Sequence, residues 1–554
     1  MNYNKRIYSF DVFDTCLVRL CGSASNVFDI LSAKLFPDNE QLRKIFIALR
    51  TEVDCPTLEA AYNAIGNIMK LPLPVNEMVK LEMATEHSML KPVRATKQLI
   101  DKLRIKNGCN IVFLTDMYLP SNFIRMVLTD NGLYKEGDKL VVSGEKGVWK
   151  YDGTMFHYVK EAEGITYRHW HHWGDNHHSD YIVPRRLGIH AHLLRYDYLY
   201  FEQKWQDIIC TASYQYPSIL AGVSRAIRLS VGTIEYQNNF VSDITAPFIT
   251  SWICTILNDA QHRNIERIYF CARDMHSHYH IAKVLSPYFP DIEPKYIFIS
   301  RKSLYSGNPL IIKYLEQEGV ASAESVALAD AVSSGNTLHT INQLLTQNGY
   351  TPIAHFYCIN GKWGADMGKG ETDKEQFTED NQHAQYILLD RHIATTANNA
   401  LERTIENIVF HEILPSLNYH GTTTTYVRHG NTIRPQLSDD CNWQFAGFSH
   451  HDIKNNNDSL LTTFADAYAA TGLIAYSDKI LEYIALPTLV QFIDNPPKVY
   501  LHYLHIFQLD GTPFVNKRYR PNRWKRGSSA YTFSSYTLQI LRKVKKKLYG
   551  LLTR

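Results

Sequence analysis

The sequence predicts an α/β protein with two parallel-sheet domains and a largely helical C-terminal region. Short apolar runs bounded by turn residues alternate with helical stretches over residues 5–195, and the same alternation returns over residues 241–425. A chain of 554 residues is also too long to fold around one hydrophobic core. We therefore expect two domains that each bury a core of their own.

The elements follow one another in a regular order. The first domain, residues 1–195, is expected to contain the strands "RIYSF", "NIVFLT", "KLVVS" and "HHWGD", with a long helical insert at about residues 25–90 between the first two. Residues 196–240 are expected to form a helical connector. The strands of the second domain, residues 241–425, are expected at "RIYFCARD", "KYIFISRK", "SVALADAV", "AHFYCING" and "QYILLD". Residues 426–554 form the helical C-terminal region.

Composition and charge are those of an ordinary globular protein. Hydrophobic residues make up 45% of the chain, and a formal net charge of +3 is too small to indicate a nucleic acid as partner. The nine cysteines include no CxxC pair, so neither a zinc site nor a disulfide framework is expected. The N-terminus lacks a signal-peptide run and no other stretch is expected to span a membrane, which favours a cytoplasmic location.

Polar residues gather where the strands of the first domain end. Asp11 closes "IYSF", and Thr115 closes "NIVFLT". Lys150 opens "KYDGTMF", and "GDNHHSD" supplies Asp175 and Asp180. Because open parallel sheets bind ligands at the carboxyl ends of their strands, these residues offer a nucleophile, a hydroxyl, a cation and hard oxygen ligands for Mg²⁺ in one place.

In this order and spacing the motifs "DVFDT", "FLTD", "KYDGTMF" and "GDNHHSD" resemble those of the haloacid dehalogenase superfamily, over about residues 5–195. The resemblance implies a Rossmann-like domain with a helical cap, in which Asp11 attacks phosphorus. It also implies that Asp11, Asp175 and Asp180 hold Mg²⁺ while Thr115 and Lys150 bind the phosphoryl oxygens.

One departure from the superfamily pattern concerns the general acid. Phosphatases of the superfamily usually carry a second Asp two residues after the nucleophile, where this chain has Phe13, and Asp14 follows one residue late. Either Asp14 or water serves as the acid, or the centre is slow or inactive. The chain also has four histidines near the last motif that could pass for zinc ligands: His171, His172, His177 and His178. We interpret them mainly as residues that line the site.

A second candidate site lies in "VALADAVSSGNTL", where a strand expected to end at Asp330 leads into a polar turn and a helix. Backbone N–H groups of such a turn and the helix N-terminus form an anion site. The stretch resembles the phosphoribosyl pyrophosphate loop of type I phosphoribosyltransferases, although Ala329 replaces the first of two acidic residues. The resemblance implies that Asp330 binds the ribose hydroxyls and that the turn binds the 5-phosphate through Ser333, Ser334, Gly335, Asn336 and Thr337.

The strand "RIYFCARDM" has the layout of the pyrophosphate-binding loop of the same fold. It places Arg273 and Asp274 at a strand end, and the next strand leads to Arg301 and Lys302, so cations gather at one edge. Pairing of Arg273 with Asp274 is the structural alternative.

Together the two regions resemble bifunctional enzymes that install ribofuranose in bacterial surface polysaccharides. The resemblance implies transfer of a 5-phosphoribosyl group from phosphoribosyl pyrophosphate to a glycan acceptor, which is lipid-linked in that setting, followed by removal of the 5-phosphate with Mg²⁺ as cofactor. A nucleotide-salvage type transferase fused to a phosphatase, and a non-catalytic scaffold with degenerate sites, remain alternatives.

The C-terminal tail is strongly basic. No acidic residue follows Asp510, and hydrophobic residues at helical spacing between Leu538 and Leu551 alternate with lysines and arginines. A basic amphipathic segment favours peripheral contact with an anionic membrane surface, whereas a solvated helix packed on its own domain and RNA binding are the alternatives.

Overall fold

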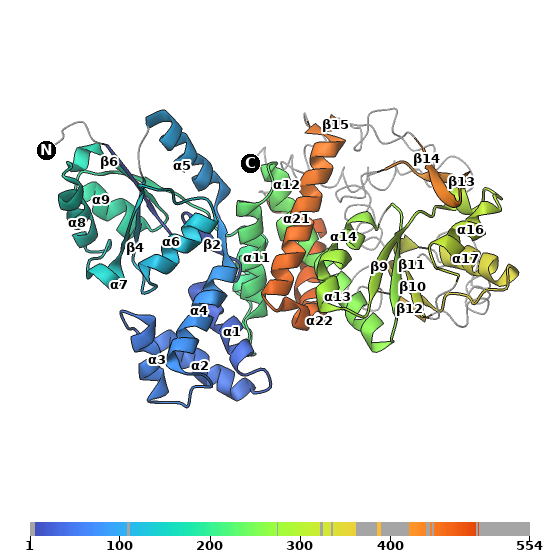
Figure 1. The fold of residues 1–554 in the computed structure, drawn as a ribbon, viewed down its shortest axis with the longest axis horizontal. Coiled ribbons are helices and arrows are strands. Elements are labelled where there is room, and N and C mark those ends of the chain that lie inside the picture. The colour runs from blue at the N-terminus through green and yellow to red at the C-terminus, as the bar shows by residue number, and fades with distance from the viewer. Residues whose placement is uncertain are drawn as a thin grey trace. The chain divides into compact units, whose positions relative to one another are not determined.

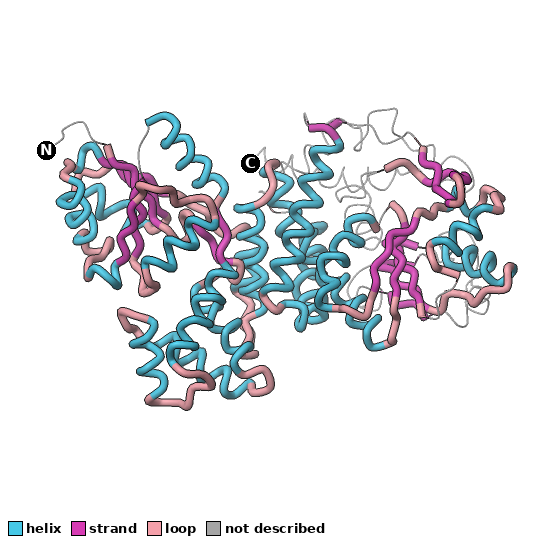
Figure 2. Tube along the Cα trace, in the orientation of Figure 1, coloured by secondary structure: helices cyan, strands magenta, loops and turns pink. Residues whose placement is uncertain are grey.

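The computed structural model describes residues 6–107, 111–273, 275–321, 325–333, 336–361, 385–388, 420–438, 444–445, 448–494 and 497. The chain separates into two compact units, of which the first comprises Met1–Val231 with Ala467–Tyr476 and the second Gly232–Asp466 with Ser477–Arg554. The first boundary falls within the stretch expected to be a connector. Strands gather into one main sheet in each unit (Figure 2).

The first unit is built on a five-stranded parallel sheet in the order β5-β4-β1-β6-β7. Its strands are β1 (Ile7–Asp11), β4 (Ile111–Thr115), β5 (Lys139–Val142), β6 (Trp170–Gly174) and β7 (His190–Leu193). After β1, the chain adds β4 and then β5 on one side of it. It then crosses over and adds β6 and β7 on the other side. The carboxyl ends of β1 and β6 therefore flank the switch point at which parallel sheets bind ligands.

Alternation along the strands divides the core of the first unit into two halves. Phe10 and Phe113 lie in one buried cluster with residues of α5 (Arg94–Asn107) and α6 (Ser121–Asp130). Leu114 and Trp170 lie in the other cluster with residues of α8 (Thr154–Glu163) and α9 (Val183–Arg186). Each face of the sheet is thus covered by helices, as the near-continuous apolar character of β1 and β4 requires (Figure 1).

The expected helical insert consists of four helices between the two short antiparallel strands β2 (Leu17–Arg19) and β3 (Leu90–Pro92). These helices are α1 (Ala24–Leu35), α2 (Glu40–Glu52), α3 (Leu58–Gly66) and α4 (Val75–Met89). The first three begin after side-chain caps from Ser23, Asn39 and Thr57, whose oxygens accept backbone N–H groups of the first turn.

A buried ion pair joins two helices of the insert. The guanidinium of Arg50 lies 2.7 Å from Glu82, and the Tyr62 hydroxyl donates to the same carboxylate at 2.5 Å. Both charged side chains are almost fully buried, so loss of either partner would leave an uncompensated buried charge.

The first unit also contains α7 (Ser143–Lys146), α10 (Tyr200–Gln206) and α11 (Tyr216–Ser230). Much later in the chain, the segment Ala467–Tyr476 returns to this unit. Its Tyr476 ring stacks on Tyr214 and Tyr216, with centroids 4.9 and 5.3 Å apart. A remote stretch of sequence therefore completes the packing of the first unit.

The second unit contains a parallel sheet in the order β12-β11-β10-β8-β9. Its strands are β8 (Arg267–Cys271), β9 (Glu293–Ile297), β10 (Val326–Ser333), β11 (His355–Gly361) and β12 (Gln385–Leu388). Its helices include α12 (Glu235–Phe240), α13 (Ala246–His262), α14 (His276–Leu285), α15 (Arg301–Leu304), α16 (Leu310–Gln317) and α17 (Asn336–Gln347). In this sheet β9 is added on one side of β8 and β10 on the other, so β8 and β10 flank the switch point.

Two local expectations differ from the structure. β10 does not end at Asp330 but continues to Ser333, because pairing with β11 persists through Ser333 and Gly361. The helical run Asn238–His262 is long and apolar enough to span a membrane, contrary to expectation. Nearly all of it is buried inside the protein, which is how the core helix of a globular domain also behaves.

The C-terminal region begins with the hairpin β13 (Thr423–His429) and β14 (Thr432–Leu437) and the two-residue strands β15 (Gln444–Phe445) and β16 (Phe448–Ser449). It then becomes helical in α21 (His450–Ala470), α22 (Ser477–Ile480) and α23 (Leu486–Asp494). The basic tail lies outside the described residues. The predicted fold class, two parallel-sheet α/β units with a helical insert and a largely helical C-terminal region, is confirmed.

Candidate active site

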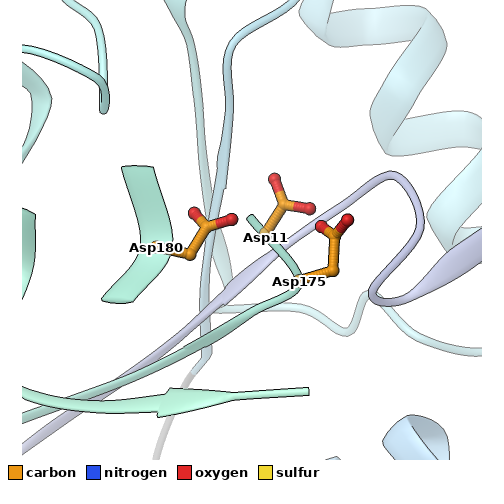
Figure 3. Close-up of side chains that lie close together, drawn as sticks. All are labelled: Asp11, Asp175 and Asp180. Carbon is orange, nitrogen blue, oxygen red and sulfur yellow. The ribbon is translucent and has the colours of Figure 1, made fainter. Parts of the chain in front are cut away.

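Three carboxylates converge at the switch point of the first sheet (Figure 3). Asp11 is the last residue of β1, Asp175 directly follows β6, and Asp180 lies in a π-helical turn, His177–Ile182. One oxygen from each carboxylate lies within 4.8 Å of the others. Within the described ranges, no other group of three His, Cys, Asp or Glu side chains has this arrangement.

Lys150 links two of these carboxylates. Its ammonium Nζ lies 2.5 Å from Asp11 Oδ1 and 2.7 Å from Asp180 Oδ1, and the side chain is nearly fully buried. Its backbone N–H donates to the Asp116 carboxylate at 3.0 Å, which fixes the chain where it enters the site. Burial alone would lower the pKa of Lys150, but Asp11 and Asp180 raise it above its usual value, so the ammonium stays charged.

The site carries excess negative charge. With three carboxylates and one ammonium the formal charge is −3 + 1 = −2. Burial, with the neighbouring carboxylates Asp180 and Asp175, raises the pKa of Asp11 well above its usual range. Burial also raises the pKa of Asp175, whereas Lys150 and His172 overcome the burial of Asp180 and lower its pKa.

This arrangement fits a hard divalent cation. Mg²⁺ prefers oxygen ligands and usually binds proteins through one or a few carboxylates, and a charge of +2 would offset the excess of −2. Asp11 and Asp180 are buried while Asp175 is more exposed, so the group is accessible on one side. The residues predicted as metal ligands therefore lie together, where they could hold one metal ion.

The residues around the position of the missing general acid have other contacts. Asp14 has a left-handed backbone, with φ 57°, and its carboxylate forms an ion pair with Arg225 at 2.6 Å. The Arg19 guanidinium lies over the ring of Phe13, 4.5 Å from its centroid. The Thr15 hydroxyl donates to Asp175 at 3.1 Å. Arg225 lies 211 residues beyond Asp14, so sequence spacing gave no signal for this pair.

Thr115, the predicted phosphoryl ligand, is buried at the carboxyl end of β4, next to the strand that carries Asp11. The histidines expected to line the site separate into different environments. His172 is fully buried and contacts Asp180, whereas His171 stacks on Tyr8, and His177 and His178 are exposed. Of these four residues, the structure therefore brings only His172 into contact with the carboxylate cluster.

The second candidate site surrounds Arg273, which follows β8 and precedes α14. Its side chain is buried, and within the described residues no hydrogen-bond partner lies against Nη1. Burial lowers the pKa of nearby His420, and the positive charges of His276, Arg273 and Lys454 lower it further. Among the described residues, an acidic side chain also lies near this group, because Asp458 is 3.9 Å from His276. Positive charge thus accumulates beyond the carboxyl end of β8.

The other predicted residues of this site are only partly described. Asp330 is half-buried on β10, one residue beyond Ala329, which pairs with Phe270 of β8. Asp330 therefore lies on β10 beside the carboxyl end of β8, and Arg273 follows that strand. Ser333 ends β10, α17 begins at Asn336 and continues through Thr337, and Arg301 and Lys302 are exposed in α15. Asp274, Ser334 and Gly335 lie outside the described residues.

Comparisons with known proteins give matches among solved structures. No family model matches the chain, and no curated protein matches it. A HAD phosphatase from Thermococcus onnurineus is similar over 35% of this chain and 87% of its own, with 19% identity and a TM-score of 0.26.

Two further structures match a similar share of the chain. The HAD-hydrolase YfnB from Bacillus subtilis, bound to magnesium, matches 33% of this chain and 86% of its own, with 17% identity and a TM-score of 0.25. The HAD family enzyme bt-2542 from Bacteroides thetaiotaomicron, a magnesium complex, matches 34% and 93%, with 18% identity and a TM-score of 0.26.

Proposed function

We propose that the first unit is a Mg²⁺-dependent phosphomonoesterase that forms an aspartyl phosphate on Asp11. The observation that carries the proposal is the contact of one buried ammonium, Lys150, with two members of a three-carboxylate cluster. The haloacid dehalogenase motifs support this proposal. The two magnesium-bound structures named above are likewise described as a HAD-hydrolase and a HAD family enzyme.

In this proposal Asp11 attacks phosphorus, the bond from phosphorus to the leaving oxygen breaks, and water then hydrolyses the aspartyl phosphate. Lys150 and the Thr115 hydroxyl hold the phosphoryl oxygens. Asp11, Asp175 and Asp180 would hold Mg²⁺, which would supply positive charge against the phosphoryl group.

The proton for the leaving group is proposed to come from water. Phe13 has no proton to donate, and the side chain of Asp14 is engaged in an ion pair with Arg225. A site without a positioned acid favours esters whose leaving groups need no protonation. We therefore expect faster hydrolysis of an aryl phosphate such as p-nitrophenyl phosphate than of an alkyl phosphate.

The test compares Asp11→Asn with Asp130→Asn, a matched change at an exposed aspartate of the same unit. With p-nitrophenyl phosphate and Mg²⁺, Asp11→Asn should lose essentially all turnover because the amide is not a nucleophile. Asp130→Asn should retain it. Turnover by Asp11→Asn at the wild-type rate would exclude the aspartyl-phosphate mechanism.

We also propose that the second unit transfers a 5-phosphoribosyl group from phosphoribosyl pyrophosphate. Within the described residues, the buried guanidinium of Arg273 has no hydrogen-bond partner at Nη1, which is costly unless an anion binds there, and a diphosphate supplies that charge. Transfer would break the bond from ribose C1 to pyrophosphate and form a glycosidic bond to a glycan hydroxyl. The first unit would then hydrolyse the 5-phosphate of the product to leave ribofuranose.

The test of the second proposal uses phosphoribosyl pyrophosphate, Mg²⁺ and a panel of synthetic glycans, with mass detection of products. Asp330→Asn should reduce transfer by about 10²-fold or more, while hydrolysis of p-nitrophenyl phosphate continues. Product on a purine base rather than a glycan would favour the salvage alternative. Absence of donor binding by calorimetry would favour a scaffold.

We place this chemistry in bacterial surface polysaccharide biosynthesis, at the inner face of the cytoplasmic membrane. The basic tail, residues 517–554, supports peripheral contact with anionic lipid near a lipid-linked acceptor.

A further inference from the structure

A buried chain of hydrogen bonds leads from the core of the first sheet to the carboxylate cluster. Trp170 Nε1 donates to Ser9 Oγ at 2.7 Å, and Ser9 Oγ lies 2.8 Å from His172 Nδ1. His172 Nε2 lies 3.1 Å from Asp180 Oδ1. All four side chains are fully buried. Ser9 and His172 are also register partners on β1 and β6, so the sheet itself holds the central link.

The directions of these hydrogen bonds are set at both ends of the chain, by an indole N–H that only donates and by a carboxylate that only accepts. An indole N–H only donates, so Ser9 Oγ accepts it and has its own hydroxyl proton available for His172 Nδ1. A neutral imidazole that accepts at Nδ1 carries its proton on Nε2, from which it donates to Asp180. The opposite tautomer would place the lone pair of Nε2 against a carboxylate oxygen.

His172 completes a set of three donors around Asp180. Oδ1 of Asp180 accepts from His172 and from Lys150, and Oδ2 accepts from the backbone N–H of Asn176 at 3.1 Å. Lys150 also contacts Asp11, so it does not fix the plane of the Asp180 carboxylate by itself. The edge of the Phe156 ring packs on the imidazole, with centroids 5.2 Å apart, and limits its rotation.

We infer that His172 is a positioning residue that orients the Asp180 carboxylate toward the cation, in a tautomer set by Ser9 and Trp170. The inference rests on the phosphatase function proposed above. His172 would act through Asp180 and touch neither substrate nor metal. Partners that orient metal ligands in this way commonly contribute about 10- to 100-fold to metal affinity or activity.

The experiment compares three variants of the full-length protein. His172→Leu removes the donor, His172→Gln keeps an N–H donor, and His190→Leu changes an exposed histidine of β7 as control. In His172→Leu, Mg²⁺ binding measured by calorimetry should weaken about 10- to 100-fold and kcat should fall with little change in KM. His172→Gln should recover most of both, and the control should match the wild type. Equal Mg²⁺ affinity in His172→Leu and the wild type would overturn the inference.

A second measurement detects the tautomer in the wild type itself and uses a His172 variant only to assign the signal. In the metal-free wild type labelled with ¹⁵N-histidine, the signal absent from the His172→Gln or His172→Leu spectrum should report a proton on Nε2 and none on Nδ1. A proton on Nδ1 would overturn the inference. Loss of the proposed function looks different, because the wild type itself would then bind no Mg²⁺ and hydrolyse no phosphate ester.

Discussion

Replacement of Lys150 by Met removes one charge from the centre of the carboxylate cluster. The ammonium contacts Asp11 at 2.5 Å and Asp180 at 2.7 Å, and all three groups are buried. Met has a similar length but donates no hydrogen bond, so the formal charge of the site changes from −2 to −3. Truncation of one member of a buried ion pair typically lowers the free energy of unfolding by about 3 to 5 kcal/mol, and we expect that loss without metal.

Mg²⁺ separates this effect on stability from the effect on catalysis. Because the cation can offset part of the uncompensated charge, millimolar Mg²⁺ should restore stability more in Lys150→Met than in the wild type. Turnover should stay lower by a factor on the order of 10² to 10³, because the group that neutralises the phosphoryl oxygens in the transition state is missing.

The assay combines urea denaturation, with and without Mg²⁺, with hydrolysis of p-nitrophenyl phosphate. Lys146→Met, at an exposed lysine of α7, is the matched control and should behave as the wild type. If Lys150→Met turned over substrate normally, or unfolded like the wild type without metal, Lys150 would not hold the charge balance of the site.

Three further outcomes are expected. Glu82→Gln should lower the free energy of unfolding by about 3 to 5 kcal/mol, because it leaves the Arg50 charge buried without its partner; a change below 1 kcal/mol in urea denaturation would contradict this. Burial raises the pKa of Asp29 from 3.8 to about 7, so the native state retains a proton that the unfolded state loses, and stability should decline as pH rises from about 4 to 7. In Asp29→Asn, this decline in the free energy of unfolding, on the order of 3 to 4 kcal/mol, should be absent. If the free energies of unfolding of variant and wild type differed by the same amount at pH 5 and pH 8 in urea denaturation, the assignment would be wrong. Deletion of residues 530–554 should reduce sedimentation with anionic liposomes, most clearly at low salt, while p-nitrophenyl phosphate hydrolysis is retained; unchanged sedimentation would exclude the tail as a membrane contact.

The parts of the site that could be predicted are those that strand ends bring together. Asp11, Thr115 and Asp175 each stand where an apolar run stops, and parallel strands place such positions at one edge of a sheet. Their meeting in space therefore required only the strands and their direction. The order of the motifs predicts Lys150 as a residue of the site. Its contact with Asp11, which is 139 residues away in the sequence, depends on the fold.

The parts that could not be predicted depend on register and on tertiary packing. His172 faces Asp180 because it pairs with Ser9, and no single strand contains that information. Likewise, β10 continues past Asp330 because β11 offers it partners through Gly361. The buried run Asn238–His262 has the composition of a membrane span, and only its burial in the folded chain distinguishes it from one.

The return of Ala467–Tyr476 to the first unit affects how the protein is made. During synthesis, Tyr214 and Tyr216 lack their contact with Tyr476 until the whole sheet of the second unit has been made. The packing of the N-terminal unit is thus complete only after more than two hundred later residues have been synthesised. A gene cut after Val231 encodes a first unit that lacks its final segment, so the two units are not separable modules at the level of the gene.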